Sequence, residues 1–222
     1  MGAYKVVEIF ESINGEGRKA GQLAVFVRFQ GCNLNCSYCD TRWANAANAA
    51  YTVMSEQEIY DRITASGIKN VTLTGGEPLL QKDIESLLVK LAADKNLSVE
   101  IETNGSISLE RFCRLNNAPA FTMDYKLPLS GMEKFMCLDN FNYLTAKDTV
   151  KFVAGDMEDL KRARTIIEKF SLTNKCAVYF SPVFGAINLT DMVDFMKQYR
   201  LNGINLQLQM HKIIWTPDAR GV

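Results

Sequence analysis

The segment Gly31-Cys32-Asn33-Leu34-Asn35-Cys36-Ser37-Tyr38-Cys39-Asp40-Thr41 holds three cysteines in the spacing Cys-x3-Cys-x2-Cys. A loop this short can wrap three thiolates around one face of a cubane iron–sulfur cluster. Most such clusters take four cysteines, so a set of three leaves one iron without a protein ligand. Because an open iron can bind a small molecule, the segment predicts chemistry at the cluster rather than electron transfer alone.

The remaining cysteines and the single histidine leave three alternatives open. A structural zinc site usually takes four Cys or His ligands, but the chain has one histidine, His211, and no second cysteine pair. A conventional electron-transfer cluster would need a distant fourth ligand from Cys113, Cys137 or Cys176, which we interpret as ordinary small apolar residues. The third alternative is chance clustering of buried thiols. Three thiols within eight residues favour metal binding in a reducing compartment.

Short apolar runs on both sides of this loop alternate with amphipathic stretches. We expect four helices, at residues 54–66, 84–91, 156–170 and 188–199. Ser55 and Glu58 form a capping box at the start of the first, and Asp156 is the cap of the third. A loop or loose helical turn is expected at residues 44–50. The expected strands are residues 23–29, 70–74, 98–102, 120–124, 149–153, 176–180 and 204–208.

This alternation predicts parallel strands covered by helices. A closed eight-stranded barrel usually needs about 250 residues, whereas six or seven strands fit this chain. We therefore expect an α/β fold, a partial, open parallel β/α barrel of about six strands, in a single domain covering residues 1–222. A flat doubly wound sheet is the alternative. In both folds ligands bind at the carboxyl ends of the strands, where this chain has its cysteine loop and its polar or glycine-rich turns.

The composition argues against several classes of protein. Hydrophobic residues make up 47% of the chain and charged residues 23%, which argues against disorder. The 25 basic and 25 acidic side chains cancel, so no global positive field favours nucleic acid. No apolar run reaches the roughly 20 residues of a membrane helix, and residues 1–10 lack the order of a signal peptide. We expect a cytoplasmic protein with no nucleic-acid or membrane partner.

The cysteine spacing, with Tyr38 just before the third cysteine, resembles that of the radical S-adenosylmethionine (SAM) superfamily. The resemblance implies a [4Fe–4S] cluster held by Cys32, Cys36 and Cys39, with SAM on the open iron and a 5′-deoxyadenosyl radical as the reactive species. It also accounts for the sequence Thr-Gly-Gly-Glu-Pro at 74–78, because a glycine pair lines the methionine part of SAM in this superfamily. Backbone without a Cβ can approach a ligand closely, although such a sequence alone would be an ordinary turn.

Further motifs narrow the resemblance to one family. Residues 9–17 (Ile-Phe-Glu-Ser-Ile-Asn-Gly-Glu-Gly), Arg-Phe-Gln-Gly-Cys at 28–32, Cys-Asp-Thr at 39–41 and His-Lys at 211–212 are together similar to the 7-carboxy-7-deazaguanine synthase family. That resemblance implies a lyase that converts 6-carboxy-5,6,7,8-tetrahydropterin to 7-carboxy-7-deazaguanine with loss of ammonia, in queuosine and deazapurine biosynthesis. It also implies Mg²⁺, a flavodoxin or ferredoxin as electron donor, and a homodimer.

The resemblance also assigns site residues by position. Arg28 would pair with the substrate carboxylate, which suits its planar guanidinium. Thr41 would be the protein ligand of Mg²⁺, a cation that prefers oxygen ligands. The other substrate-binding residues would be Ile13, Asn14, Gly15, Glu16, Thr74 and His211. The residues lining SAM would be Tyr38, Gly75, Gly76, Glu77, Glu102, Asn104, Asp124, Tyr125, Lys126 and Ser181. No proton-transfer residue is assigned.

Five of these residues also have purely structural interpretations. Arg28 interrupts an apolar strand and could form a buried ion pair. Thr41 could hydrogen-bond within its loop, and His211 could lie on the surface. Lys126 could be a solvated loop charge, and Glu102 could face solvent at the end of its strand.

Three stretches differ from the common family pattern. Asn14 stands where Gln is frequent in the family, and Asp-Tyr-Lys at 124–126 replaces the common Ser-Pro-Lys. The chain also continues to Val222, whereas short family members end about six residues past the equivalent of His211.

Two other functions share part of the pattern. An activating enzyme that installs a glycyl radical on a partner protein has the same cysteine spacing and the same Gly-Gly-Glu-Pro sequence. It would not need Arg28, Thr41 and His211 to converge on a small anion. A non-enzymatic iron–sulfur carrier or zinc module would hold a fully ligated metal and would not bind SAM.

Overall fold

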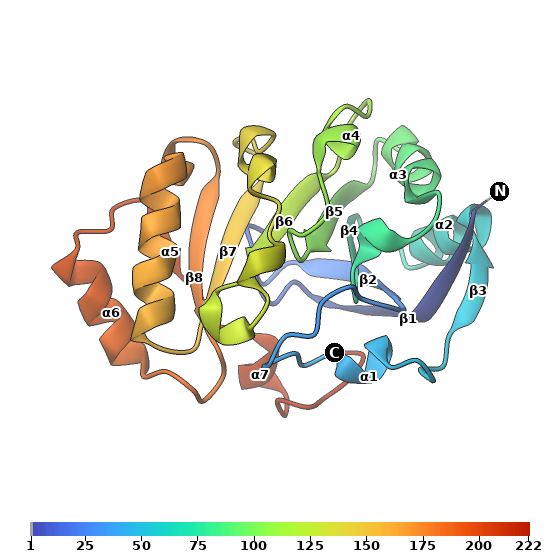
Figure 1. The fold of residues 1–222 in the computed structure, drawn as a ribbon. Coiled ribbons are helices and arrows are strands. Elements are labelled where there is room, and N and C mark those ends of the chain that lie inside the picture. Colours follow the sequence, from blue (N-terminus) through green and yellow to red (C-terminus); the bar gives the residue numbers. More distant parts are fainter. Residues whose placement is uncertain (1) are drawn as a thin grey trace.

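Nine strands form one mixed sheet in the computed structural model, which describes residues 2–222 (Figure 1). Their order across the sheet is β3-β1-β2-β4-β5-β6-β7-β8-β9, so β3 and β9 are the two edges. The strands are β1 (Ala3–Ile13), β2 (Leu23–Phe29), β3 (Thr52–Ser55), β4 (Asn70–Gly75), β5 (Ser98–Thr103), β6 (Ala120–Tyr125), β7 (Thr149–Ala154), β8 (Ala177–Pro182) and β9 (Ile204–Leu206).

Strands β2 and β4 to β9 run parallel to one another. They are the seven strands predicted from the sequence, with ends that differ by no more than two residues. The sheet is open and mostly parallel, which confirms the predicted α/β fold class. The number of parallel strands is seven, compared with the expected number of about six.

The sequence analysis predicts neither β1 nor β3. Strand β1 pairs antiparallel with β2 and, on its other side, antiparallel with β3. Tyr4 and Val6 of β1 are buried, whereas Glu8 and Glu11 interrupt its apolar pattern. A strand of mixed composition gives a weak alternation signal, which is why the pattern missed it. The antiparallel pair extends the sheet and places Ile13 beside Leu23, so the turn after β1 lies next to the beginning of β2.

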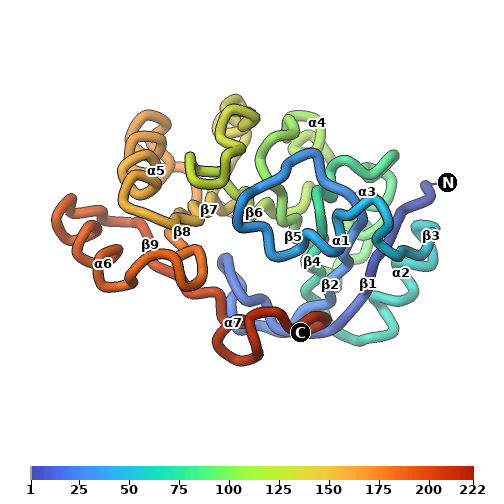
Figure 2. The backbone as a smooth tube through the Cα atoms, turned by 60° about the horizontal axis from the view of Figure 1, so that its bottom comes forward, coloured from blue at the N-terminus to red at the C-terminus, as the bar shows by residue number. Residues whose placement is uncertain are grey.

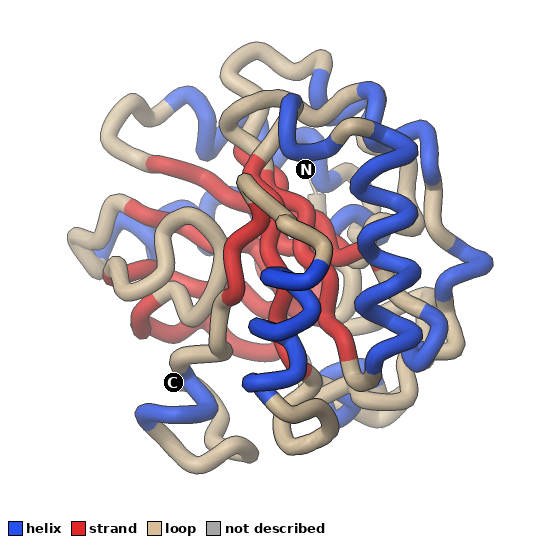
Figure 3. The backbone as a smooth tube through the Cα atoms, turned by 90° about the vertical axis from the view of Figure 1, so that its left-hand side faces the viewer, coloured by secondary structure: helices blue, strands red, loops and turns tan. Residues whose placement is uncertain are grey.

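The longer helices of the described chain cover the outside of this sheet. Figure 3 shows the strands in red at the centre with the blue helices packed around them. The α-helices are α1 (Arg42–Asn45), α2 (Glu56–Ala65), α3 (Ile84–Ala93), α4 (Glu110–Cys113), α5 (Met157–Phe170), α6 (Leu189–Gln198) and α7 (His211–Ile214). Short 3₁₀ turns are η1 (Pro78–Leu80), η2 (Pro128–Ser130), η3 (Glu133–Phe135), η4 (Leu138–Asn142) and η5 (Leu172–Asn174).

Side-chain caps fix the start of three of the long helices, and an apolar stripe determines which face the fourth one buries. Ser55 and Glu58 form the predicted capping box of α2, with each side chain bound to the other residue's backbone N–H. Asp156 caps α5 by accepting from Asp159 N, and Asn188 caps α6 by accepting from Thr190 N. Helix α3 buries the predicted stripe Ile84, Leu87, Leu88 and Leu91. The predictions for these helices are confirmed.

The parallel strands have an apolar face and a polar face. Buried apolar residues align across neighbouring strands, as Leu73 with Ile101, and belong to the hydrophobic core. The alternate positions carry polar side chains that align in the same way, as Asp124 with Lys151. Successive side chains of a strand point to opposite faces, so one face packs on the helices while the other supplies polar groups to the interior.

The open side of the sheet is bridged by side-chain and backbone hydrogen bonds. The Gln207 side chain accepts from Gly17 N at 2.6 Å and donates to Gly17 O at 3.0 Å. Met210 N donates to Gly15 O at 3.2 Å. These contacts tie the segment after β9 to the turn after β1. In Figures 1 and 2 this segment continues through α7 to the C-terminus, which lies near α1.

None of the helices in residues 2–222 is both long and apolar enough to cross a membrane.

Candidate active site at the carboxyl ends of the strands

The carboxyl ends of the parallel strands and the loops after them surround a cavity of about 450 Å³. This volume is within the range of small-molecule sites. Its walls come from the cysteine loop, the turns after β4, β5 and β6, strand β7, and the C-terminal segment. The cavity therefore lies at the edge where open parallel sheets bind ligands.

The cysteine loop, residues 31–41, is held in place at its centre. Ser37 N donates to Ser130 O at 3.1 Å, and the Ser37 hydroxyl donates to Leu129 O at 2.7 Å. The Arg42 guanidinium donates to the carbonyls of Cys36 and Ser37 at 2.8 and 2.7 Å. The loop is thus positioned by η2 on one side and by α1 on the other.

The three thiols line the same cavity and have polar neighbours. Cys32 Sγ lies 3.5 Å from Asn104 Nδ2, which donates toward it. Thr41 Oγ1 lies 3.6 Å from Cys39 Sγ. Burial raises the pKa of the Cys32 and Cys36 thiols. Cys32 and Cys36 are therefore protonated at neutral pH and release protons when they bind a metal.

A cubane cluster fits this set of thiols better than a single metal ion. Within residues 2–222, no three His, Cys, Asp or Glu side chains converge on one point as a single-ion site requires. Cys32, Cys36 and Cys39 are free thiols that line one cavity, and no other cysteine of the described chain lines it. Because each thiolate of a cubane binds a separate iron, three thiols suit a cluster with one open iron.

The glycine pair after β4 lets this strand end meet the start of the cysteine loop. A Cβ on Gly75, whose φ is +127°, would lie 2.3 Å from Phe29 O. A Cβ on Gly76 would lie 1.8 Å from Gly31 O and 2.3 Å from Asn45 Oδ1. Both glycines line the cavity, so the absence of side chains serves the packing of two backbones as well as access to a ligand.

Glu77 lies directly after the glycine pair but does not line the cavity. Its side chain is 0% exposed and accepts from Asn104 N at 2.6 Å, from Leu79 N at 3.0 Å and from the Thr103 hydroxyl at 3.0 Å. Burial raises its pKa to about 7, although these donors oppose the shift. Glu77 therefore fixes the turn that carries Asn104 and, through Asn104, the surroundings of Cys32.

A buried group of charges forms the floor of the cavity. Lys151 Nζ lies 2.8 Å from Glu16 Oε2 and 3.1 Å from Asp124 Oδ1, and Lys126 Nζ lies 2.8 Å from Asp124 Oδ2. Burial alone would lower the pKa of Lys151, but Asp124, Glu16 and Glu102 outweigh it and raise the pKa well above its usual value. Burial would likewise raise the pKa of Asp124, yet the two ammonium groups hold it below its usual range. Lys151 and Asp124 are therefore both ionised.

Arg28, Thr74 and Glu102 form a row across three strands. Arg28 of β2 is the register partner of Thr74 in β4, and the Thr74 hydroxyl donates to Glu102 Oε2 of β5 at 2.6 Å. Burial raises the pKa of Glu102. The side chain lines the cavity and does not simply face solvent.

Aromatic rings surround the Arg28 guanidinium. Its central carbon lies 5.5 Å from the ring centre of Phe10 and 5.8 Å from that of Trp43. Arg220, near the C-terminus, lies over the same Trp43 ring at 4.3 Å. The C-terminal segment thus folds back on the cavity wall, and it contributes residues 217–222 to the lining.

His211 lies at the start of α7 and faces the turn after β1. A Cβ on Gly15 would lie 2.6 Å from His211 Nδ1, so the ring packs directly on this glycine. Burial lowers the pKa of His211, which keeps the imidazole neutral near pH 7. Lys212 beside it pairs with Asp40 of the cysteine loop at 3.0 Å. His211 is therefore a cavity residue rather than a surface one.

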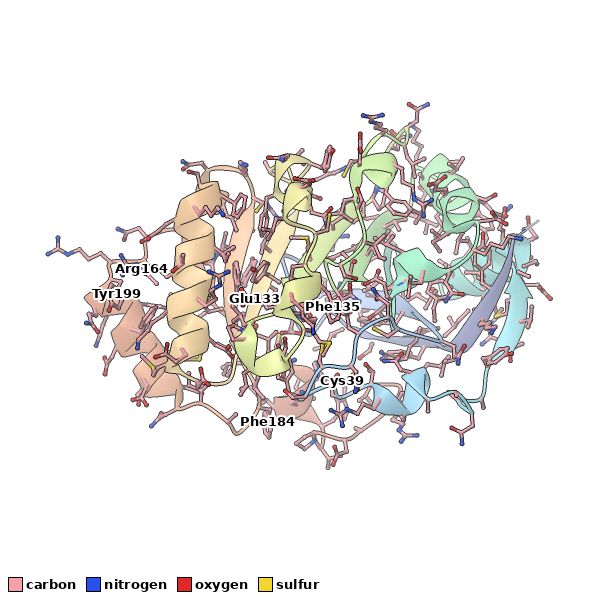
Figure 4. All side chains as sticks on the ribbon, in the orientation of Figure 1. Cys39, Glu133, Phe135, Arg164, Phe184 and Tyr199 are labelled. Carbon is pink, nitrogen blue, oxygen red and sulfur yellow. The ribbon has the colours of Figure 1, made fainter. Side chains whose placement is uncertain are left out.

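The opening of the cavity has an exposed aromatic residue, Phe184, in the loop after β8. Figure 4 shows Phe184 and Cys39 toward the lower edge of the molecule. Arg164 of α5 lies over the ring of Tyr199 at 4.1 Å on the flank formed by α5 and α6. The opening and this flank are separate surfaces.

Most of the residues predicted for the site come together in this cavity. Those that line it are Ile13, Gly15, Glu16, Arg28, Cys32, Cys36, Tyr38, Cys39, Thr41, Thr74, Gly75, Gly76, Glu102, Asn104, Asp124, Lys126 and His211. The structure places Asn14, Glu77, Tyr125 and Ser181 behind the lining. Asn14 accepts from the Thr72 hydroxyl at 2.9 Å, and the Tyr125 hydroxyl donates to Glu133 at 2.9 Å. These contacts give both side chains structural partners.

The sequence analysis missed Lys151, Trp43 and residues 217–222. Lys151 interrupts the apolar run of β7, which is the same signal that singled out Arg28 in β2. Trp43 and the C-terminal residues carry no comparable signal, because their position depends on how the chain after β9 folds back.

A second cavity, of about 620 Å³, lies at the opposite end of the strands. It is lined by the beginnings of β5 and β6 and by four basic residues, Arg18, Lys19, Lys95 and Lys147. No cysteine is among its lining residues in the described chain. Chemistry rather than volume therefore identifies the smaller cavity as the candidate active site.

Comparisons with known proteins agree with this geometry. The family model of the Radical SAM superfamily matches residues 26–127, a range that contains the cysteine loop and the glycine pair. The 7-carboxy-7-deazaguanine synthase of Clostridium acetobutylicum is 60% identical over 219 residues, which cover 99% of each chain. That of Chlorobaculum tepidum is 37% identical over 220 residues, 98% of this chain and 96% of the relative.

A solved structure has a similar fold. The crystal structure of QueE from Escherichia coli superposes with a TM-score of 0.71 over 94% of this chain and 95% of that one. The identity between the two sequences is 21%, so this likeness concerns the fold.

Proposed function

Because the chain belongs to the 7-carboxy-7-deazaguanine synthase family of the radical SAM superfamily, we propose that it converts 6-carboxy-5,6,7,8-tetrahydropterin to 7-carboxy-7-deazaguanine. The reaction contracts a ring and releases ammonia, which makes the protein a carbon–nitrogen lyase of deazapurine biosynthesis. A [4Fe–4S] cluster on Cys32, Cys36 and Cys39, together with SAM, is the cofactor set of this superfamily.

The observation that carries the proposal is the mixed lining of one cavity. Three thiols and the glycine pair meet there with a guanidinium, a neutral imidazole and a partly unpaired carboxylate, from Arg28, His211 and Glu16. A metal-free anion pocket would not need the thiols, and an electron carrier would not need the polar groups. An enzyme that uses a cluster on a small anionic heterocycle needs both.

Each polar group has a task that its geometry allows. The Arg28 hydrogen bond to Glu8 uses Nε, so its terminal nitrogens are available for a substrate carboxylate. His211, held neutral by burial, can donate at one ring nitrogen and accept at the other. The cluster and SAM, when bound, supply the one-electron chemistry that starts the reaction. Positioning by these side chains then limits the paths open to a reactive substrate.

Mg²⁺ is the second metal of the proposal, with Thr41 as its protein ligand. The Thr41 hydroxyl lines the cavity beside Cys39. A single hydroxyl leaves the remaining positions of an octahedral shell to substrate oxygens and water, which is common for this ion.

The proposal also includes the setting in which the enzyme works. We propose residues 1–222 as a single catalytic domain that forms a homodimer, with a flavodoxin or ferredoxin as the external reductant. All six cysteines are free thiols, which fits a reducing, cytoplasmic compartment.

Anaerobic turnover tests the proposal. The protein, with its cluster reconstituted, is incubated with SAM, Mg²⁺, a reductant and 6-carboxytetrahydropterin, and 7-carboxy-7-deazaguanine is followed by mass spectrometry. We expect product only when every component is present, and none from the Cys36→Ala variant. Formation of 5′-deoxyadenosine without the product would contradict the substrate assignment. Failure to bind a cluster would contradict the whole proposal.

A further inference from the structure

Lys151 is a buried lysine in the cavity floor for which the proposed function has no role so far. It lies in the middle of β7, between apolar neighbours, and its side chain is 8% exposed. Its ammonium group touches two carboxylates from distant parts of the chain, Glu16 after β1 and Asp124 at the end of β6. Lys151 therefore connects the turn after β1 with the strand ends near the cysteine loop.

The two carboxylates depend on Lys151 to different degrees. Asp124 has a second cation, Lys126, at 2.8 Å. Glu16 has, besides Lys151, only the Gln209 amide at 3.3 Å among the hydrogen-bond donors of residues 2–222. Removing the Lys151 ammonium group would leave Asp124 paired but would leave Glu16 as a buried charge without a cation, which is strongly unfavourable.

The free oxygen of Glu16 indicates what this arrangement is for. Lys151 and Gln209 both bind Oε2, whereas Oε1 is buried and has no hydrogen-bond partner within the described chain. Glu16 lines the cavity. Because a buried carboxylate oxygen without a donor is costly, this oxygen is suited to accept an N–H group from a ligand.

We propose that Lys151 is a positioning residue that holds Glu16 by Oε2 so that Oε1 accepts an N–H of the substrate ring. The inference rests on the proposed function, since a tetrahydropterin carries several N–H donors. Lys151 acts through Glu16 and does not itself contact the substrate. Its contact with Asp124 keeps the ammonium group at a fixed place between the two carboxylates.

The test compares Lys151→Met with Glu16→Gln and with the double variant, all as reconstituted holoenzyme. We expect Lys151→Met to raise the KM for the pterin about tenfold or more, the effect of losing a hydrogen bond to a charged group. The KM for SAM should change less than threefold, because Asp124 keeps Lys126. The double variant should be no worse than Glu16→Gln alone, because both changes remove the same interaction.

Two further measurements separate positioning from loss of structure. Binding of the fluorescent analogue 6-carboxypterin, measured without turnover, should weaken in parallel with KM, and Lys151→Arg should restore part of it. Lys147→Met, which removes a lysine outside the active-site cavity, is the matched control and should leave both values unchanged.

Two results would overturn the inference. One is an unchanged pterin KM and unchanged 6-carboxypterin binding in Lys151→Met. The other is additive effects in the double variant, which would show that Lys151 acts independently of Glu16. The wild-type enzyme distinguishes these failures from failure of the proposed function: without product from the wild type, the function itself is wrong.

Discussion

Arg28 of β2 and Glu8 of β1 face each other in the antiparallel pair, and Arg28 Nε donates to Glu8 Oε1 at 2.7 Å. The ion pair holds the guanidinium at the cavity wall by its inner nitrogen. The terminal nitrogens are the ones that an anion can reach. The two interpretations of Arg28 that the sequence leaves open, a structural ion pair and a substrate ligand, are therefore compatible in one residue.

Replacing Arg28 tests this double use. Arg28→Ala should raise the KM for the pterin by about 10- to 100-fold, the cost of a lost charge-assisted hydrogen bond of about 1.5–3 kcal/mol. Arg28→Lys should recover little, because one ammonium group cannot bind Glu8 and present a fork to a carboxylate. Steady-state kinetics at saturating SAM measures both. A Lys variant with wild-type KM would contradict bidentate binding by the guanidinium.

Gly76 should tolerate no side chain, because the added Cβ would overlap Gly31 O at the start of the cysteine loop. We expect Gly76→Ala to lose most of its bound iron after reconstitution, measured by iron content and by absorbance of the cluster. Gly185→Ala is the control: that glycine has φ +76° but open space around it. Gly185→Ala should lower the free energy of unfolding by about 1–2 kcal/mol and should retain its bound iron. Equal iron in both variants would contradict the packing argument.

Glu77 should make stability depend on pH. Its usual pKa is near 4.5 and burial raises it to about 7 in the folded chain. Between these values the folded state holds a proton that the unfolded state releases, so this contribution to stability falls as pH rises. The loss is nearly complete about one pH unit above 7 and amounts to about 3 kcal/mol.

Glu77→Gln removes this titration while keeping one carbonyl oxygen as acceptor. The free energy of unfolding of the metal-free protein, from urea titrations at pH 5 and pH 7.5, should fall with pH more steeply in the wild type than in the variant. Identical pH dependence of the two proteins would show that the Glu77 carboxyl is not buried as described.

Gln207 should stabilise the open side of the sheet through its paired hydrogen bonds with Gly17. Gln207→Leu should lower the free energy of unfolding by about 1–3 kcal/mol and speed hydrogen exchange at the Gly17 amide. Asn205→Ala is the control, since within residues 2–222 the Asn205 side-chain amide donates only to Val178 O, in the sheet. In Asn205→Ala, the hydrogen-exchange rate of the Gly17 amide should match that of the wild type. Unchanged exchange in Gln207→Leu would mean that the turn is held by other contacts.

Local sequence predicted the parts of the fold that depend on neighbouring residues. The capping box of Ser55 and Glu58, the cap at Asp156 and the apolar runs of the parallel strands all act over a few residues. Strand β1 was missed because its alternation is interrupted by Glu8 and Glu11. The reason for Glu8 is visible only in the folded chain, where β1 pairs with β2 and Glu8 lies opposite Arg28.

The candidate site divides in the same way. Cysteine spacing and the glycine pair identified its metal-binding part, and resemblance to a family supplied most of the polar residues. Glu77 could not be separated from its cavity-lining neighbours by sequence, since its burial depends on Thr103 at the end of β5 and on Asn104 just after it. Lys151 could have been suspected, because a lysine in an apolar strand needs a partner, but nothing local names that partner.

The sequence by itself determined the alternating strands and helices, the three-thiol loop and the edge of the sheet at which they meet. These follow from periodicity, capping and ligand spacing, all of which are local. Only the tertiary structure decided that Lys151 joins Glu16 to Asp124, that Glu77 supports Asn104, and that the C-terminal segment packs on Trp43. Such pairings are set by strand register and by the path of the chain in space, because charges and rings interact with whatever folding brings within a few ångströms.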